Sequence, residues 1–394
     1  MADTAVSSAP YDVLVVGGGP VGSYVAWKSA EAGLRAGVLE EHDVIGEPVM
    51  CGGLVAPRCM EFLPKPMADE VTLARIRGAR IFPPKGEPFE FTAKEPRGIV
   101  MSRGEFDRKF ALCARQAGAE LRLGSKFWDG RRENGHVEIS TDHGEKLRTR
   151  ILVGADGVSS RVSRVFGLGR PKEIIPQAGF YTPNNGLGTD HVDVLVGTRR
   201  APGFFAWMIP GPCDLNVGLG VSRGHRAKDY LDKLADEMGG RWRVSERRLY
   251  TSGIPVGFPD CTGMGNIALV GDAAAQAKPT SGGGIYTGLY CAEILQKVIA
   301  EQLRTGDVAL ESYDHLWKED LGPELRRGMW LRKIFLNLDD KQLQAACDVL
   351  RDPRIIKVIE EHGDIDFPSK LIAPLLRHAP SLARFAGPLL KSLI

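Results

Sequence analysis

The sequence has no excess of charge of either sign, and its cysteines form no recognisable pattern. Lys and Arg number 51 and Asp and Glu 49, so the 394 residues carry a formal net charge of +2. This balance provides no general attraction to nucleic acid. The seven cysteines include no Cys-x-x-Cys pair, so neither a metal site nor a secreted disulfide framework is indicated. We expect no metal and no nucleic-acid partner.

Long apolar runs are also missing. No stretch reaches the about 18–20 apolar residues of a membrane span, and residues 1–10 do not have the basic-then-apolar order of a signal peptide. Residues 367–394 are apolar with regularly spaced basic residues. They suit either short helices that cap a domain or a surface that covers a lipid tunnel or rests on a membrane. We expect a cytoplasmic protein, and the pattern leaves peripheral membrane contact open.

The clearest positive signal is a strand, a glycine turn and a helix near the start of the chain. Residues 11–16 are an apolar run that predicts a buried parallel strand. Residues 17–22 read Gly-Gly-Gly-Pro-Val-Gly, which matches Gly-x-Gly-x-x-Gly. In this pattern Gly17 allows the tight turn, Gly19 lets a pyrophosphate approach, and Gly22 lets the helix pack on the strand.

An acidic residue follows at the spacing that a dinucleotide site needs. The expected helix at 23–32 leads to a strand at 35–39, which ends at Glu40, eighteen residues after Gly22. A carboxylate there can accept hydrogen bonds from both ribose hydroxyls. Since all four features occur in order, we predict a dinucleotide site, with Val21 of the turn among its contacts.

Two later strands end in aspartate. Residues 151–155 lead into Asp156-Gly157, and residues 267–271 lead into Asp272. These segments resemble the two further fingerprints of the para-hydroxybenzoate hydroxylase-like flavoprotein superfamily, in which the second aspartate binds the ribityl chain of FAD. The resemblance implies that Asp272 has this role and that Asp156 matches the earlier fingerprint. An Asp-Gly pair alone is also typical of a plain turn.

A helix expected from residue 103 to Ala117 begins with an arginine. The superfamily resemblance of residues 101–107 implies that Arg103 lies beside the FAD pyrophosphate, where a guanidinium can offer two parallel donors. The dipole at a helix start disfavours a cation, so a solvated position is the weaker interpretation. The strand expected at 120–127 would pass the adenine, so that Phe127 would give backbone contacts only.

The remaining segments have different patterns. Strands predicted at 174–180, 191–196 and 215–221 lie between glycines and prolines, as in a second, antiparallel sheet, and the chain after residue 292 is helical in pattern. The expected fold class is α/β, with a Rossmann-like FAD-binding domain, an inserted antiparallel-sheet substrate domain and a helical C-terminal region. The expected boundaries are 1–74, 96–170 and 263–300 for the first domain, 75–95 and 171–262 for the second, and 301–394 for the third.

An aromatic pair lies within the expected substrate sheet. Residues 202–210 read Pro-Gly-Phe-Phe-Ala-Trp-Met-Ile-Pro, so Phe205 and Trp207 share one face of a strand. Such a wall suits an apolar chain or ring, or it fills the core between sheets. The segment resembles the Pro-x-x-Tyr-x-Trp-x-Phe-Pro motif of the geranylgeranyl reductase family, with Phe205 replacing the tyrosine and Ile209 the last phenylalanine. It equally resembles the Trp-x-Trp-x-Ile-Pro motif of flavin-dependent halogenases, so this motif does not separate the two families.

A loop with a cysteine favours the reductase family. Residues 46–55 resemble the cysteine–glycine loop beside the flavin in that family, which implies cofactor contacts for Cys51, Gly52 and Leu54. A buried free cysteine usually behaves as a small apolar residue. The alternative is that Cys51 packs against the isoalloxazine or supplies a proton.

A second glycine-rich loop, residues 278–285, resembles the loop that follows the aspartate in archaeal geranylgeranyl reductases. Its glycines expose backbone N–H groups at the start of a helix. Donors at Gly283, Gly284 and Ile285, together with the helix dipole, would stabilise negative charge at N1 of the reduced flavin.

The resemblance implies a reductase that hydrogenates isolated C=C bonds of geranylgeranyl chains in membrane lipid synthesis, by hydride transfer from reduced FAD. An unactivated alkene has no heteroatom to polarise, so the protein must position the chain and exclude water. We therefore take Cys51, Phe205 and Trp207 as the candidate catalytic residues.

The electron donor and the competing functions stay open. The sequence has no second Gly-x-Gly-x-x-Gly after a strand. The electron donor is therefore NAD(P)H bound transiently, reduced ferredoxin or a reduced deazaflavin, and ferredoxin would be an electron-donor partner protein. The alternatives are an oxygen-using aromatic monooxygenase or halogenase, and an electron-carrier flavoprotein that has no enclosed apolar tunnel.

Overall fold

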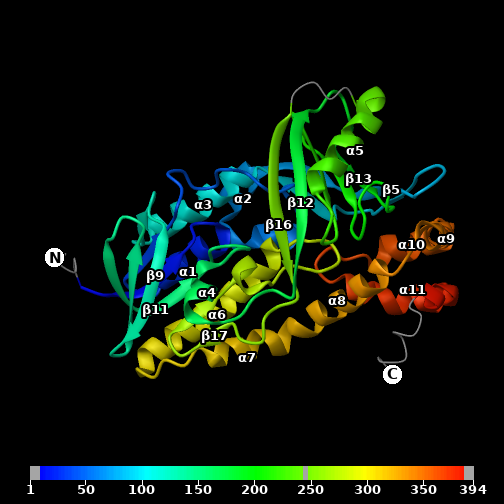
Figure 1. The fold of residues 1–394 in the computed structure, drawn as a ribbon. Helices are drawn as coiled ribbons and strands as arrows, with labels where there is room; N and C mark the ends of the chain where they lie inside the picture. Colours follow the sequence, from blue (N-terminus) through cyan, green and yellow to red (C-terminus); the bar gives the residue numbers. More distant parts are fainter. Residues whose placement is uncertain (1–8, 243–246, 386–394) are drawn as a thin grey trace.

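The computed structural model describes residues 9–242 and 247–385, and Figure 1 shows their fold. An eight-stranded sheet begins with β1 (Tyr11–Val16), which lies between β2 (Ala36–Leu39) and β11 (Lys146–Gly154) and is parallel to both. The order along the sheet is β17, β18, β11, β1, β2, β8, while β9 and β10 extend it from β11 as antiparallel strands. The further strands are β8 (Glu120–Arg122), β9 (Phe127–Glu133), β10 (His136–Thr141), β17 (Gly263–Met264) and β18 (Ile267–Leu269).

Both faces of β1 are buried, as its apolar run predicts. Val13 and Val15 belong to a core shared with three helices, whereas Leu14 and Val16 face a second core on the other side of the sheet. The three helices are α1 (Pro20–Glu31), α3 (Arg103–Gln116) and α6 (Ile285–Thr305). Helix α1 contacts both α3 and α6, so its glycine-rich start is fixed from two sides.

A second sheet of seven strands has the order β16, β12, β15, β14, β13, β5, β6, and Figure 1 shows it standing out from the first, with α5 (Ala227–Trp242) alongside. The strands expected at 174–180, 191–196 and 215–221 are confirmed. The sheet is antiparallel, as expected, except that β13 runs parallel to β5. No hairpin joins these two strands, so nothing in their connection requires opposite directions. The strands are β5 (Gly78–Phe82), β6 (Phe89–Thr92), β12 (Glu173–Pro183), β13 (His191–Leu195), β14 (Ala206–Pro210), β15 (Asp214–Gly220) and β16 (Arg248–Val256).

A third sheet of three strands lies between the two larger sheets and packs against both. It consists of β3 (Leu54–Val55), β7 (Gly98–Met101) and β4 (Thr72–Ile76). Residues 75–76 therefore pair here rather than in the seven-stranded sheet, although the domain boundaries as a whole stay a prediction.

The single strand expected at 120–127 is wrong. The segment forms two strands, β8 and β9, because Gly124 adopts a left-handed conformation with φ of +59° and turns the chain between them. Phe127 begins β9, and its side chain is buried against the ring of Phe166, with 6.4 Å between centroids. The predicted backbone contact of Phe127 with the cofactor stays a prediction.

The C-terminal region is helical, as predicted, and Figure 1 shows α7 and α8 leading to α9, α10 and α11. None of the helices in the described ranges is long and apolar enough to cross a membrane. Residues 386–394 of the apolar stretch at 367–394 lie outside the described part of the chain. The elements are α7 (Glu311–Asp320), α8 (Gly322–Leu336), α9 (Asp340–Leu350), α10 (Pro353–His362), η3 (Pro368–Leu371) and α11 (Ile372–His378).

Helix α7 is attached to the nucleotide-binding sheet through Trp317. The indole is fully buried and donates to the hydroxyl of Thr262 at 2.8 Å, and Asp314 of the same helix accepts from the Thr262 backbone at 2.7 Å. Helix α7 is therefore part of the folded core.

We predict that Trp317→Ala lowers the free energy of unfolding by about 3–5 kcal/mol, because it leaves a cavity and removes the bond to Thr262. Urea unfolding with FAD in excess measures the change. Trp128→Ala is the matched control, since Trp128 is 50% exposed and its loss should cost about 1 kcal/mol or less. Equal effects of both substitutions would contradict the attachment of α7 through Trp317.

Candidate functional site

The first glycine turn is closed by backbone contacts that leave no room for side chains. Gly17 has φ of +106°, and a Cβ there would lie 2.3 Å from the carbonyl oxygen of Ala155. A Cβ at Gly22 would lie 2.1 Å from the oxygen of Gly17. Gly19 differs, because a Cβ there would meet nothing within 4 Å. The turn is thus packed underneath and open above Gly19, at the start of a helix with no side-chain cap, which suits an approaching phosphate.

Glu40 is held at this turn from the end of β2. One carboxylate oxygen accepts from the N–H of Gly18 at 2.7 Å, and the other accepts from the N–H of His42 at 3.0 Å. The ring nitrogen Nδ1 of His42 lies 2.6 Å from the second oxygen. Glu40 is therefore at the edge of the turn, where its ribose role stays a prediction.

The last fingerprint meets the first through Val21. A Cβ added at Gly271 would lie 3.3 Å from the Val21 side chain, and one added at Gly288 would lie 2.8 Å from it. Val21 therefore packs the start of α1 against η2 (Gly271–Ala274) and α6. This contact brings the Gly17–Gly22 turn and the Asp272 loop together, as the sequence predicts.

Asp272 lies beside the N-terminus of α6. A Cβ at Gly284 would be only 2.7 Å from its carboxylate oxygen, and α6 has no side-chain cap. Asp272 is partly exposed to solvent. The surrounding protein nevertheless desolvates its carboxylate and so raises its pKa, and the positive charge of Arg103 partly offsets this rise. The carboxylate of Asp272, which can accept hydrogen bonds, thus lies next to the backbone N–H groups of Gly284 and Ile285, which can donate them.

Asp156 accepts hydrogen bonds at the start of a helix, a structural role that the sequence only partly indicates. Its carboxylate accepts from the Ser160 hydroxyl at 2.6 Å and from the backbone of Arg161 at 2.6 Å and Val162 at 3.0 Å. These bonds begin α4 (Arg161–Phe166). Burial nevertheless raises the pKa of Asp156. The side chain is used by the helix start, so a contact with the cofactor stays a prediction.

Arg103 is the first residue of α3, and its guanidinium is only partly bonded. One terminal nitrogen donates to Asp107 at 2.8 Å, while the buried Nε has no hydrogen-bond partner within the described chain. Burial opposes its charge, but the nearby Asp107, Cys51 and Asp272 outweigh this and raise its pKa. Burial also raises the pKa of Asp107 to about 6, although Arg103 partly offsets this. A buried cation with a spare donor fits an anionic ligand such as pyrophosphate.

The cysteine loop crosses from this region to the seven-stranded sheet. Cys51 is a half-buried free thiol whose carbonyl accepts from the Tyr181 hydroxyl at 2.5 Å. A Cβ at Gly52 would lie 2.7 Å from Ile209 and 3.4 Å from the indole nitrogen of Trp207. Leu54 packs in the cluster that contains Ile209. The structure therefore joins the loop to the aromatic wall, which the sequence leaves separate.

Trp207 is fixed in orientation by its neighbours. Its indole nitrogen donates to Asn216 at 2.8 Å, and the Asn216 amide donates to the hydroxyl of Tyr250 at 3.2 Å. The ring lies over Gly218, its cross-strand partner, where a Cβ would be 2.5 Å away. Phe205 meets Trp207 edge to face at 6.0 Å between centroids. The two rings therefore adjoin each other, and their role as a wall for the substrate stays a prediction.

Three polar residues around this wall were not predicted from the sequence. Tyr181, Asn216 and Tyr250 come from β12, β15 and β16, and burial raises the pKa of both phenols. The alternation in each strand signals only that these positions face inward. Their meeting depends on strand register, which places Tyr181 opposite Asn216.

An apolar cavity of about 170 Å³ lies between Phe205 and the glycine-rich loop. Phe205 lies on one side, Pro279 of the loop on another, and helix α8 closes the third. The lining residues are Phe204, Phe205, Pro279, Thr280, Leu331, Arg332 and Phe335.

We predict that Gly19→Ala leaves the apoprotein stable within about 1 kcal/mol, since φ there is −66° and the space is open. The methyl group would enter the space the pyrophosphate needs, so FAD affinity should fall roughly tenfold or more. Gly22→Ala should instead destabilise the apoprotein by about 1–3 kcal/mol through its clash with Gly17. Urea unfolding and fluorescence titration with FAD measure the two effects, and unchanged FAD affinity in Gly19→Ala would contradict the placement.

The open cradle above Gly19, the spare donor of Arg103 and the uncapped start of α6 fit FAD, and comparisons with known proteins agree. Residues 10–177 match the family described as FAD binding domain. The chain is 31% identical over 365 residues to digeranylgeranylglycerophospholipid reductase of Methanothrix thermoacetophila, covering 88% of this chain and 93% of that protein. It is also 31% identical over 402 residues to digeranylgeranylglycerophospholipid reductase 2 of Methanopyrus kandleri, covering 97% and 100%.

A solved structure shares the whole architecture. The geranylgeranyl bacteriochlorophyll reductase-like protein of Thermoplasma acidophilum superposes with a TM-score of 0.84 at 26% identity, covering 98% of this chain and 99% of that one. Because the identity is 31% to two relatives over 88% and 97% of this chain, the chain belongs to the FAD-binding digeranylgeranylglycerophospholipid reductase family.

Proposed function

We propose that the protein is an FAD-dependent reductase that hydrogenates isolated C=C bonds of geranylgeranyl chains in membrane lipid synthesis. The observation that carries this proposal is the apolar cavity between the Phe205 wall and Pro279 of the glycine-rich loop. Bound FAD in its reduced form supplies a hydride. The prenyl chain of the lipid is the substrate that such an apolar space accepts.

The residues of the chain position this substrate rather than polarise it. Trp207 is locked by its bond to Asn216 and by contact with Gly218, so the wall has one shape. Phe205 stacks on Phe204 at 4.3 Å between centroids, which places a second fixed ring beside it. Rigid aromatic faces hold an alkene in place and exclude water at little cost in side-chain entropy.

Cys51 is the candidate for holding the proton that completes the reduction. It lies on the loop that reaches Trp207, it is half-exposed, and its sulfur accepts from the N–H of Gly53 at 3.4 Å. The Tyr181 phenol, whose pKa is raised by burial, stays protonated at neutral pH and donates to the Cys51 carbonyl. The loop is thereby held in place by the substrate sheet.

The electrons come from an external donor, either NAD(P)H, reduced ferredoxin or a reduced deazaflavin. The chain has a single glycine-rich nucleotide turn of the Gly-x-Gly-x-x-Gly type after a strand, so a nicotinamide would bind transiently. The prenyl lipid brings the protein to a membrane surface, where the apolar and basic C-terminal stretch would make peripheral contact.

The activity is tested by reducing the FAD-loaded protein with dithionite without oxygen and adding a geranylgeranyl glycerophospholipid. We expect the lipid to gain mass in steps of two hydrogens, as measured by mass spectrometry. No mass gain with several geranylgeranyl lipids would overturn the reductase proposal. Rapid reoxidation by oxygen with modification of an aromatic substrate would favour a monooxygenase or halogenase instead.

Trp207→Ala should lower lipid turnover by about 10–100-fold, because the alkene is no longer held at the correct height. Bound FAD should be retained, as measured by flavin absorbance per protein. Trp128→Ala is the control for loss of a tryptophan and should leave turnover unchanged, because Trp128 is exposed on β9. Loss of FAD from Trp207→Ala would show that this side chain only fills the core.

A further inference from the structure

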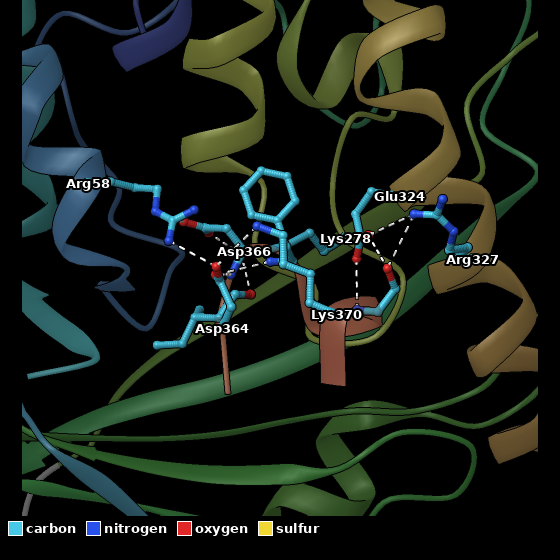
Figure 2. Close-up of polar contacts among 10 residues, drawn as sticks. Arg58, Lys278, Glu324, Arg327, Asp364, Asp366 and Lys370 are labelled. Atoms are coloured by element: carbon cyan, nitrogen blue, oxygen red, sulfur yellow. Dashed lines mark hydrogen bonds and ion pairs between the residues drawn. The ribbon is translucent and has the colours of Figure 1, made fainter. Parts of the chain in front are cut away.

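A buried ion pair joins the glycine-rich loop to the C-terminal region. Lys278 opens the loop and is 5% exposed, and Asp366, which lies between α10 and η3, is 1% exposed. The Lys278 ammonium donates to Asp366 at 2.7 Å and to the carbonyl of Ile365 at 3.0 Å (Figure 2). Lysine and aspartate are almost never this buried unless they are paired, and such a pair contributes little net stability.

The ammonium is held directly against the segment that is expected to face the flavin. A Cβ at Gly283 would lie 3.1 Å from Cε and 3.2 Å from Nζ of Lys278. The next nearest atom is the hydroxyl of Ser281 at 3.7 Å, so no atom of Asp366 comes as close. At Gly283 the positive member of the pair is therefore the nearer of its two charges.

The loop cannot swing away from this charge, because it closes on Lys278 itself. The N–H of Lys278 donates to the Gly283 carbonyl at 3.1 Å, and the N–H of Gly282 donates to the Lys278 carbonyl at 2.8 Å. The side chain and the backbone of one residue thus fix both the position of the loop and the charge behind it.

Asp366 is held in turn by a second ion pair. Arg58 of η1 (Pro57–Phe62) pairs with Asp364 at 2.9 Å, and its Nε lies 3.6 Å from Asp366. Figure 2 shows Arg58, Asp364 and Asp366 on one side of Lys278, and Glu324 and Arg327 on the other. The Asp366 carboxylate is therefore held in a fixed position, on the side of Lys278 that faces the C-terminal region.

We propose that Lys278 and Asp366 are positioning residues that set the reduction potential of bound FAD with opposite signs. This inference rests on the proposed placement of FAD at the Gly283–Ile285 segment. The Lys278 ammonium adds positive potential behind the backbone donors of that segment, which favours the more negative, reduced flavin. Asp366 limits this effect and keeps the ammonium in place, so the C-terminal region takes part in the redox chemistry through one carboxylate.

The test is the midpoint potential of FAD in the full-length protein, measured by anaerobic dye equilibration. Lys278→Met should shift the potential to a lower value, and Asp366→Asn should shift it to a higher value. Lys370→Met is the matched control. Lys370 is 62% exposed in its side chain and its nearest ion-pair partner is Asp364 at 3.9 Å, so the potential should not change.

A purely structural pair would give a different result, namely shifts of the same sign in both variants or no shift in either. That outcome would overturn the proposal. If Lys278→Met does not fold because it leaves Asp366 unpaired, the double variant Lys278→Met with Asp366→Asn removes both charges. Its potential should lie below that of the natural protein, because the nearer charge dominates, and an unchanged value would overturn the proposal.

The potential is measured without lipid, so the two proposals fail in distinguishable ways. Opposite shifts without any lipid reduction would support the redox role and contradict the proposed substrate. Lipid reduction with no shift in either variant would leave the reductase standing and contradict the redox role.

Discussion

The rest of the site depends on one close backbone contact, that between Gly17 and Ala155. It holds the ends of β1 and β11 together, so the loops after these two parallel strands emerge at one edge of the sheet. Because β18 pairs with β11 in turn, the loop carrying Asp272 emerges at the same edge. A side chain at Gly17 would separate these loops. Ligand sites of parallel sheets lie at this carboxyl edge for the same reason.

The features that could be predicted from the sequence are those in which short-range chemistry decides the structure. The apolar run of β1, the glycine turn and the start of α1 lie within a few residues, and the structure confirms them. The face shared by Phe205 and Trp207 follows from the period of a strand. The meeting of the first and last fingerprints needed the family resemblance as well, since Val21 and Gly271 are far apart in the chain.

The features that could not be predicted depend on partners that local sequence does not reveal. Lys278 and Asp366 are 88 residues apart, and nothing in either neighbourhood signals the other. The ring of polar residues around Trp207 depends on the register of four strands, and a slip of one residue would turn each side chain to the other face. Asp156 is a third example. An aspartate after a strand is expected both where it caps a helix and where it contacts a cofactor, so the local sequence does not distinguish the two roles.

The aromatic rings of the substrate sheet rest on glycines, which has a consequence for how the family can diversify. Gly218 lies under Trp207 and Gly179 under Tyr250, each pair in direct cross-strand register. The ring and its glycine share one fixed volume, so neither can change in size alone. The shape of the wall is therefore set by pairs of positions, and a wall that suits a wider or narrower chain would require both members of a pair to be exchanged together.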